Sequence, residues 1–152
     1  MLNRNLKSNL FQFCDTFVKS RISRIKNSQK DLRDALDSED KNSSGDKHET
    51  GRAMLQLEQE KLGQQLSEAE KMESVLGKVN IRSVNEIIGL GSLVQTSKHN
   101  YFLAISAGQF KEGDQSIYCI STSTPMGQLL LGKSAGDVIV FNGEQIKVQE
   151  IL

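Results

Sequence analysis

The chain has 152 residues, enough for one ordinary domain or for one small domain with an extension that buries little surface. Its 19 basic and 19 acidic residues give a formal net charge of zero, which argues against binding nucleic acid through bulk charge. The N-terminus lacks the uninterrupted apolar run of a signal peptide, and nothing elsewhere is apolar enough to span a bilayer. We therefore expect a cytoplasmic protein that does not bind membranes.

Composition changes along the chain. The first half is polar, poor in Gly and free of Pro, whereas the second half holds most of the Gly, the single Pro and the β-branched runs. This shift predicts a helical domain over residues 1–77 and a β domain over residues 78–152. Cys14 falls in the first and Cys119 in the second, and we expect both thiols to be reduced and buried, with no disulfide framework or metal-binding spacing.

Two stretches of helical periodicity fill the first half. Apolar residues recur at steps of three and four from Val18 to Leu36 and again, at heptad spacing, from Leu55 to Leu76. We expect the first helix to begin near Ser8. Neither face is wide enough to stabilise an isolated helix, so the two helices should pair. A short connector of turn formers makes the pair an antiparallel hairpin, with its tip at residues 41–49.

The positions of the predicted seam are Val18, Ile22, Ile25, Gln29, Leu32 and Leu36 in the first helix and Leu55, Leu62, Leu66, Ala69, Met72 and Leu76 in the second.

Charge is distributed unevenly along this hairpin. Residues 1–30 hold seven Lys or Arg and one acid, whereas residues 31–50 hold seven acids and three bases. A rod with a basic flank and an acidic end could orient itself in a charged channel, because summed potentials steer encounter even at zero net charge. Ordinary solvated helix faces explain the same pattern.

Two acids stand at the predicted tip. Asp46 and Glu49 lie three apart at the start of the second helix, which places both on one face beside the positive end of the helix dipole. An Asp followed three residues later by Glu is also a close relative of the capping box, in which each side chain satisfies an orphan amide. Spacing alone leaves both interpretations open.

We expect the neighbouring His48 to be a solvated tip residue.

The second half has short apolar runs separated by turn formers, which predicts a small antiparallel sheet and an α+β class for the chain. The dipeptide Asn142-Gly143 favours a type I′ hairpin, and residues 97–100 and 108–113 are predicted turns. A short helix is expected from Pro125 to Leu131, ended by Gly132. The expected strands lie in residues 92–95, 101–105, 117–120, 138–141 and 146–148.

Two segments resemble the GreA/GreB family of transcription elongation factors. Ser123-Thr124-Pro125 followed by Leu129-Leu130-Leu131-Gly132-Lys133 and Gly136-Asp137 is similar to that family's "SP…aLLGk..GD" stretch. Gly45-Asp46-x-x-Glu49 matches the family's tip motif, at a similar distance from the C-terminal stretch. The resemblance spans most of residues 18–152.

This resemblance implies an FKBP-like C-terminal domain that docks beside the secondary channel of bacterial RNA polymerase, with Ser123, Thr124 and Pro125 in the docking loop. It also implies a coiled coil that passes down the channel. Asp46 and Glu49 would help to hold a Mg²⁺ ion shared with the polymerase active site, so that a backtracked transcript is cut. The chain would be a monomeric bacterial accessory factor rather than an enzyme, with no cofactor of its own and indirect contact with nascent RNA.

The chain departs from the family directly after the second tip acid. Where Gre factors continue with Asn, a small residue, an acid and an aromatic, this chain has Thr50, Gly51, Arg52 and Ala53. The changes remove side chains that could brace the tip, and Arg52 reverses a charge. They bear on cleavage more than on docking, and the length of RNA released, GreA-like or GreB-like, does not follow from the motifs.

Two alternatives to transcript cleavage follow from the same residues. The altered positions after Glu49 favour a secondary-channel regulator that occupies the channel without cutting RNA. A narrow apolar seam between helices is also typical of a coiled-coil adaptor or dimerisation module unrelated to polymerase.

Overall fold

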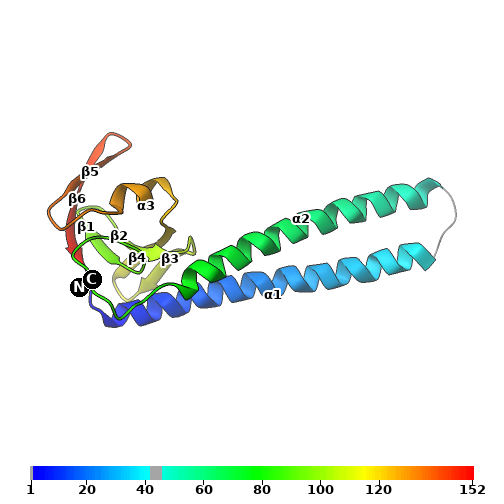
Figure 1. The fold of residues 1–152 in the computed structure, drawn as a ribbon, viewed down its shortest axis with the longest axis horizontal. Coiled ribbons are helices and arrows are strands. Elements are labelled where there is room, and N and C mark those ends of the chain that lie inside the picture. The colour runs from blue at the N-terminus through cyan, green and yellow to red at the C-terminus, as the bar shows by residue number, and fades with distance from the viewer. Residues whose placement is uncertain (1, 42–45) are drawn as a thin grey trace. The chain divides into compact units, whose positions relative to one another are not determined.

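The computed structural model describes the backbone of residues 2–41 and 46–152 and the side chains of residues 2–41 and 50–152. Its contacts divide the chain into two compact units, shown in Figure 1. The hairpin unit is Val18–Glu73, and the sheet unit combines Met1–Phe17 with Ser74–Leu152. The division at residue 77, which the shift in composition predicts, stays a prediction.

The hairpin unit contains most of two long helices, α1 (Asn5–Lys41) and α2 (Asp46–Gly77). The predicted seam is confirmed from Ile22 to Leu36 and from Leu55 to Ala69, because one apolar cluster joins both helices there. α1 begins at Asn5, ahead of the expected Ser8. The reason is Asn3, whose side chain accepts a hydrogen bond of 3.2 Å from the Leu6 amide, as an N-cap residue does. The cluster consists of Ile25, Leu32, Leu62 and Ala69, flanked by Ile22, Leu36, Leu55 and Leu66.

The sheet unit is built on a six-stranded sheet with the order β3-β4-β2-β1-β6-β5. The α+β class and the order of hairpin, sheet and short helix are confirmed. The strands are β1 (Leu93–Thr96), β2 (Asn100–Ala104), β3 (Gly108–Glu112), β4 (Gln115–Ser121), β5 (Val138–Phe141) and β6 (Glu144–Ile151).

The expectation of a wholly antiparallel sheet is wrong, because β2 and β4 pair in parallel, with Phe102 opposite Cys119. The reason is the extra strand β3, which lies in the segment 108–113 that we predicted as a turn. Since β3 adds one more reversal of the chain, β4 runs in the same direction as β2. β3 has one apolar side chain, Phe110, opposite Ile117, and its other residues are exposed or glycine, as suits a sheet edge.

Two predicted local structures are confirmed. Asn142 and Gly143 have φ values of 52° and 78°, the left-handed conformation that a type I′ turn needs at both central residues, and they join β5 to β6. The short helix α3 (Pro125–Leu130) begins with Pro, and Gly132 follows it with a φ of 80°.

The sheet is buried on both faces. One face packs with α3 in a cluster that includes Leu103, Leu130 and Ile146. Alternate strand residues point to the opposite face, which the first turns of α1 cover: the rings of Phe13 and Phe110 lie 5.4 Å apart. The sequence left the role of the N-terminal segment open, and its described residues, 2–17, complete the second core of the sheet unit. The buried residues of this second face include Leu6, Leu10, Cys14, Leu93, Phe102, Ile117 and Cys119.

Lys7 is an unusual member of that core. Its side chain is 2% exposed, and its Nζ donates a hydrogen bond of 3.3 Å to the carbonyl oxygen of Ser83. Burial removes the ammonium group from water, and the charge of Arg4 repels it, so the pKa of Lys7 is lowered from its ordinary 10.5. The protonated form of Lys7 thus opposes folding.

Replacing Lys7 by Met should change how stability depends on pH. Below the folded-state pKa of Lys7 both states are protonated and the full cost of burying the charge is present. The cost disappears as the pH rises through the folded pKa toward 10.5, because the folded protein releases the proton first. In urea unfolding, wild type should therefore gain stability relative to Lys7→Met as the pH rises toward 10.5. A difference in stability between the two proteins that stays constant as the pH rises would contradict the account.

Candidate functional site

The candidate tip acids lie at the beginning of α2. Asp46 is its first residue and Glu49 falls within its first turn, so both positions stand next to the connector as predicted. Residues 42–45 and the side chains of residues 46–49 lie outside the described residues. Capping and metal binding by Asp46 and Glu49 therefore both stay predictions.

Directly below the tip, the structure joins the two helices through polar residues. The guanidinium of Arg52 forms an ion pair with the Asp40 carboxylate, and the two side chains are 42% and 49% exposed. One position earlier, Gly51 faces Glu39: a Cβ atom on Gly51 would lie 2.7 Å from Oε1 of Glu39. Two of the four departures from the family pattern thus have a partner on the opposite helix.

The end of α1 is strongly acidic. Its last eleven residues contain five carboxylates, Asp31, Asp34, Asp37, Glu39 and Asp40, and the only basic residue in its last turn is Lys41. Carboxylates near a helix C-terminus face the negative end of the dipole, so this end of the hairpin favours a bound cation or a cationic side chain. Among the side chains that the structure describes, no three His, Cys, Asp or Glu residues come together as a metal site.

The second candidate region is the loop before α3. Thr124 is the N-cap of α3: its Oγ1 accepts a hydrogen bond of 3.1 Å from the Gly127 amide and donates one of 2.8 Å to the carbonyl oxygen of Ser121. Ser123 and Pro125 are exposed, and Ser123 Oγ lies 2.8 Å from Ser121 Oγ. Thr124 therefore holds the loop, whereas Ser123 and Pro125 present it to solvent.

Gly127 is required by the same close packing. A Cβ at this position would overlap the Ser121 carbonyl oxygen and lie 2.9 Å from Oγ1 of Thr124. The remaining motif residues also have local roles: Gly136 has a φ of 97°, and Asp137 Oδ2 accepts a hydrogen bond of 2.8 Å from the Ser134 amide. Most of the C-terminal motif is thus explained by the turns around α3.

Two exposed apolar residues flank this region, Leu131 directly after α3 and Ile87. They are 37% and 57% exposed. The segments that carry them are joined, since the Gly132 amide donates a hydrogen bond of 2.9 Å to the carbonyl oxygen of Ile88. Neither residue was predicted as a docking residue: Leu131 belongs to the C-terminal motif, and residues 81–90, which include Ile87, show no clear periodicity.

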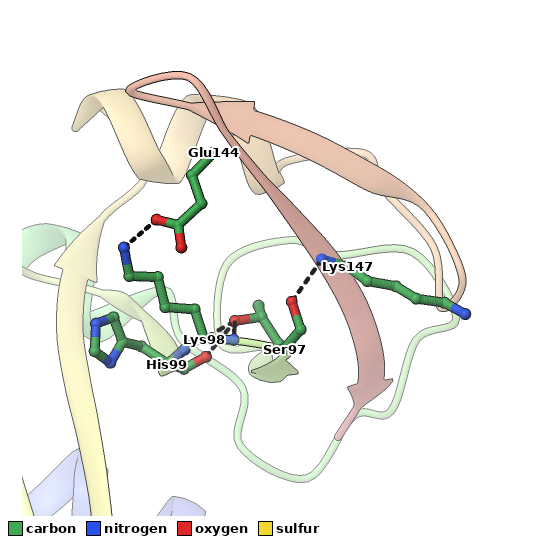
Figure 2. Close-up of polar contacts among 6 residues, drawn as sticks. Ser97, Lys98, His99, Glu144 and Lys147 are labelled. Carbon is green, nitrogen blue, oxygen red and sulfur yellow. Dashed lines mark hydrogen bonds and ion pairs between the residues drawn. The ribbon is translucent and has the colours of Figure 1, made fainter.

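His99 lies in the turn between β1 and β2, as predicted. Figure 2 shows how this turn is fastened to β6: the Lys147 amide donates a hydrogen bond of 2.9 Å to Ser97 Oγ, and Lys98 forms an ion pair with Glu144. The His99 ring packs edge-on against Tyr118, with centroids 5.2 Å apart. These contacts give His99 a role in the turn rather than in catalysis.

Cys14 and Cys119 meet in the core between α1 and the sheet, a contact that no sequence spacing indicated. Both thiols are free and buried. Their hydrogen bond lowers the pKa of Cys14 and raises that of Cys119, and burial raises the pKa of Cys119 further. Cys119 therefore acts as the donor of the pair.

In the described part of the chain, no helix is long and apolar enough to cross a membrane.

Comparison with solved structures finds that this chain is similar to structures of Gfh1. The crystal structure of GreA factor homolog 1 (Gfh1) of Thermus thermophilus is 22% identical, and the match covers 86% of this chain and 94% of Gfh1 at a TM-score of 0.34. A second structure, of the transcription factor Gfh1, is also 22% identical, with coverage of 88% and 94% and a TM-score of 0.34. At this TM-score the likeness is too loose to transfer residue roles. No family model and no curated protein matches the chain.

Gly127→Ala should destabilise the sheet unit by about 1 to 3 kcal/mol, because the added Cβ forces the Ser121 carbonyl or the Thr124 cap to move. Tyrosine fluorescence during urea unfolding measures this, since both tyrosines, Tyr101 and Tyr118, lie in the sheet unit. Gly89→Ala is the matched control, because a Cβ there meets nothing within 4 Å. Equal effects of the two substitutions would show that the close approach at Gly127 does not constrain the loop.

Proposed function

We propose that this chain is a Gre-type accessory factor that binds bacterial RNA polymerase at the secondary channel and stimulates cleavage of backtracked transcripts. The observation that carries the proposal is the position of Asp46 and Glu49 in the first turn of α2, where a confirmed helical hairpin reverses. The motif resemblance over residues 45–49 and 123–137 supports the polymerase as the partner.

The proposed chemistry requires only half a metal site from this chain. Mg²⁺ in proteins is commonly bound by one or two carboxylates together with waters and phosphate oxygens. In two-metal phosphodiester cleavage, the second ion stabilises the attacking or departing oxygen. Asp46 and Glu49 would hold that ion together with the polymerase. The acidic end of α1 adds negative potential at this end of the hairpin, which favours approach of a cation.

Docking is assigned to the loop before α3 and to the apolar residues that follow this helix. Ser123 and Pro125 are exposed at its N-terminal end, and Leu131 lies directly after its last turn. At 1.5 Å per residue, a six-residue helix spans about 9 Å, so both ends of α3 fit within one contact surface. Thr124 serves this surface indirectly, by fixing the loop that carries Ser123 and Pro125.

On this proposal the chain is a monomeric accessory factor in the cytoplasm, not itself an enzyme, and nascent RNA is contacted within the elongation complex. The structure weakens the coiled-coil adaptor as an alternative. Its apolar seam is filled within one chain, by Ile25 and Leu32 of α1 against Leu62 and Ala69 of α2. Pairing between chains would have to use another surface.

A channel regulator without cleavage activity remains the second candidate function. It is favoured by the residues after Glu49, where Arg52 brings a positive charge into the second turn of α2. The two functions share the polymerase and the channel, and they differ in whether the tip carboxylates are needed.

Transcript cleavage in stalled elongation complexes tests the proposal. Wild type should accelerate release of the RNA 3′ end, and Asp46→Asn or Glu49→Gln should reduce this by about 100-fold or more, because a bound metal contributes several kcal/mol to such a step. Glu60→Gln is the matched control, since it removes an exposed carboxylate of α2 that lies outside both the tip and the acidic end of α1.

Three results would change the assignment. Equal activity of Asp46→Asn, Glu49→Gln and wild type would leave the acids as helix caps only. If the chain slows nucleotide addition by the polymerase without stimulating cleavage, and Asp46→Asn leaves this slowing unchanged, the chain is the channel regulator instead. A stable dimer that fails to bind polymerase would exclude both and support the adaptor.

A further inference from the structure

The polar contacts below the tip join the helices at a level that the apolar seam does not reach. The seam ends with Leu36 on α1 and Leu55 on α2. Beyond it, Glu39 approaches Gly51 and Asp40 pairs with Arg52, so two consecutive residues of each helix face the other helix. We call these four residues the tip bracket.

Local helix energetics give no reason for Asp40 at its position. It is the residue before Lys41, the last of α1, where a carboxylate faces the negative end of the helix dipole. Three further acids, Asp34, Asp37 and Glu39, lie on the preceding turns and repel it. The Arg52 guanidinium offsets both effects, and its planar fork suits a carboxylate partner.

Glycine at position 51 fits the same arrangement. In the second turn of a helix, Gly costs about 1 kcal/mol relative to Ala, so its presence calls for a reason. A Cβ at this position would lie 2.7 Å from Oε1 of Glu39, which would push the Glu39 carboxylate away from α2. Gly51 therefore leaves room for the Glu39 carboxylate beside the Asp40–Arg52 pair.

We propose that the tip bracket sets the register of α2 against the end of α1, and that Arg52 is a positioning residue for Asp46 and Glu49. This inference rests on the proposed function. Arg52 follows Glu49 by three positions and Asp46 by six, so fixing Arg52 on Asp40 fixes the rotation of the turn that carries both acids.

A charge swap tests the bracket in the free protein. Arg52→Asp places two carboxylates opposite each other, so amide hydrogen exchange in residues 36–41 and 50–55 should accelerate by about two- to fivefold, the range expected for an exposed ion pair. Asp40→Arg combined with Arg52→Asp restores the pair and puts a cation at the C-terminus of α1, so exchange should return to the wild-type rate or below it. Lys61→Asp, an exposed charge reversal on the same helix, should leave these amides unchanged.

Cleavage kinetics test the positioning role. Arg52→Asp should lower kcat about tenfold with little change in the concentration of factor needed for half-maximal cleavage, and the swapped double variant should recover most of kcat. If the amides of the double variant exchange as fast as those of Arg52→Asp, the tip bracket does not set the register of the two helices. Restored exchange without restored kcat overturns the positioning role. A wild-type protein that binds polymerase but does not cleave overturns the proposed function and the positioning role together, and the exchange rates still decide the bracket.

Discussion

The packing of α1 against α2 along a narrow apolar seam is the interaction on which the tip depends. Neither helix has an apolar face wide enough to be stable alone, so each is held by the other. Ala69, which is 1% exposed, contributes to the seam despite its small size, and the larger Ile25, Leu32 and Leu62 surround it. Any function at the turn between the helices therefore depends on these apolar contacts as well as on the tip bracket.

The sheet unit follows a different rule, because its sheet is buried on both faces. Alternate residues of β2 illustrate this: Leu103 belongs to the cluster with α3, and the buried Phe102 faces the other side. A sheet of this kind needs a cover on each face, and α3 supplies only one. The start of α1 supplies the other, which explains why Leu6, Leu10 and Cys14 are buried although they precede the hairpin seam.

The features that the sequence predicted correctly are those with a local or periodic cause. The seam from Ile22 to Leu36, the Asn142-Gly143 turn and the helix at Pro125 each follow from spacing or from a residue's own conformational preference. The strand β3 was missed because an edge strand with one apolar residue has no periodic signal, and the parallel pairing of β2 with β4 was lost with it. The Arg52–Asp40 pair could not be foreseen either, because the register of two helices is a tertiary property.

The two motifs carry different kinds of information. In the C-terminal motif, Thr124, Gly127, Gly136 and Asp137 are occupied by caps and turns, so a likeness there speaks first for the local fold around α3. At the tip, no local requirement explains an acid at position 40 beside other acids, and its cation comes from the opposite helix. An arrangement that opposes local preference and is compensated only across the hairpin is typical of a functional site. The altered residues after Glu49 therefore fit a tip that is braced by other means than in the family it resembles, rather than one that has lost its support.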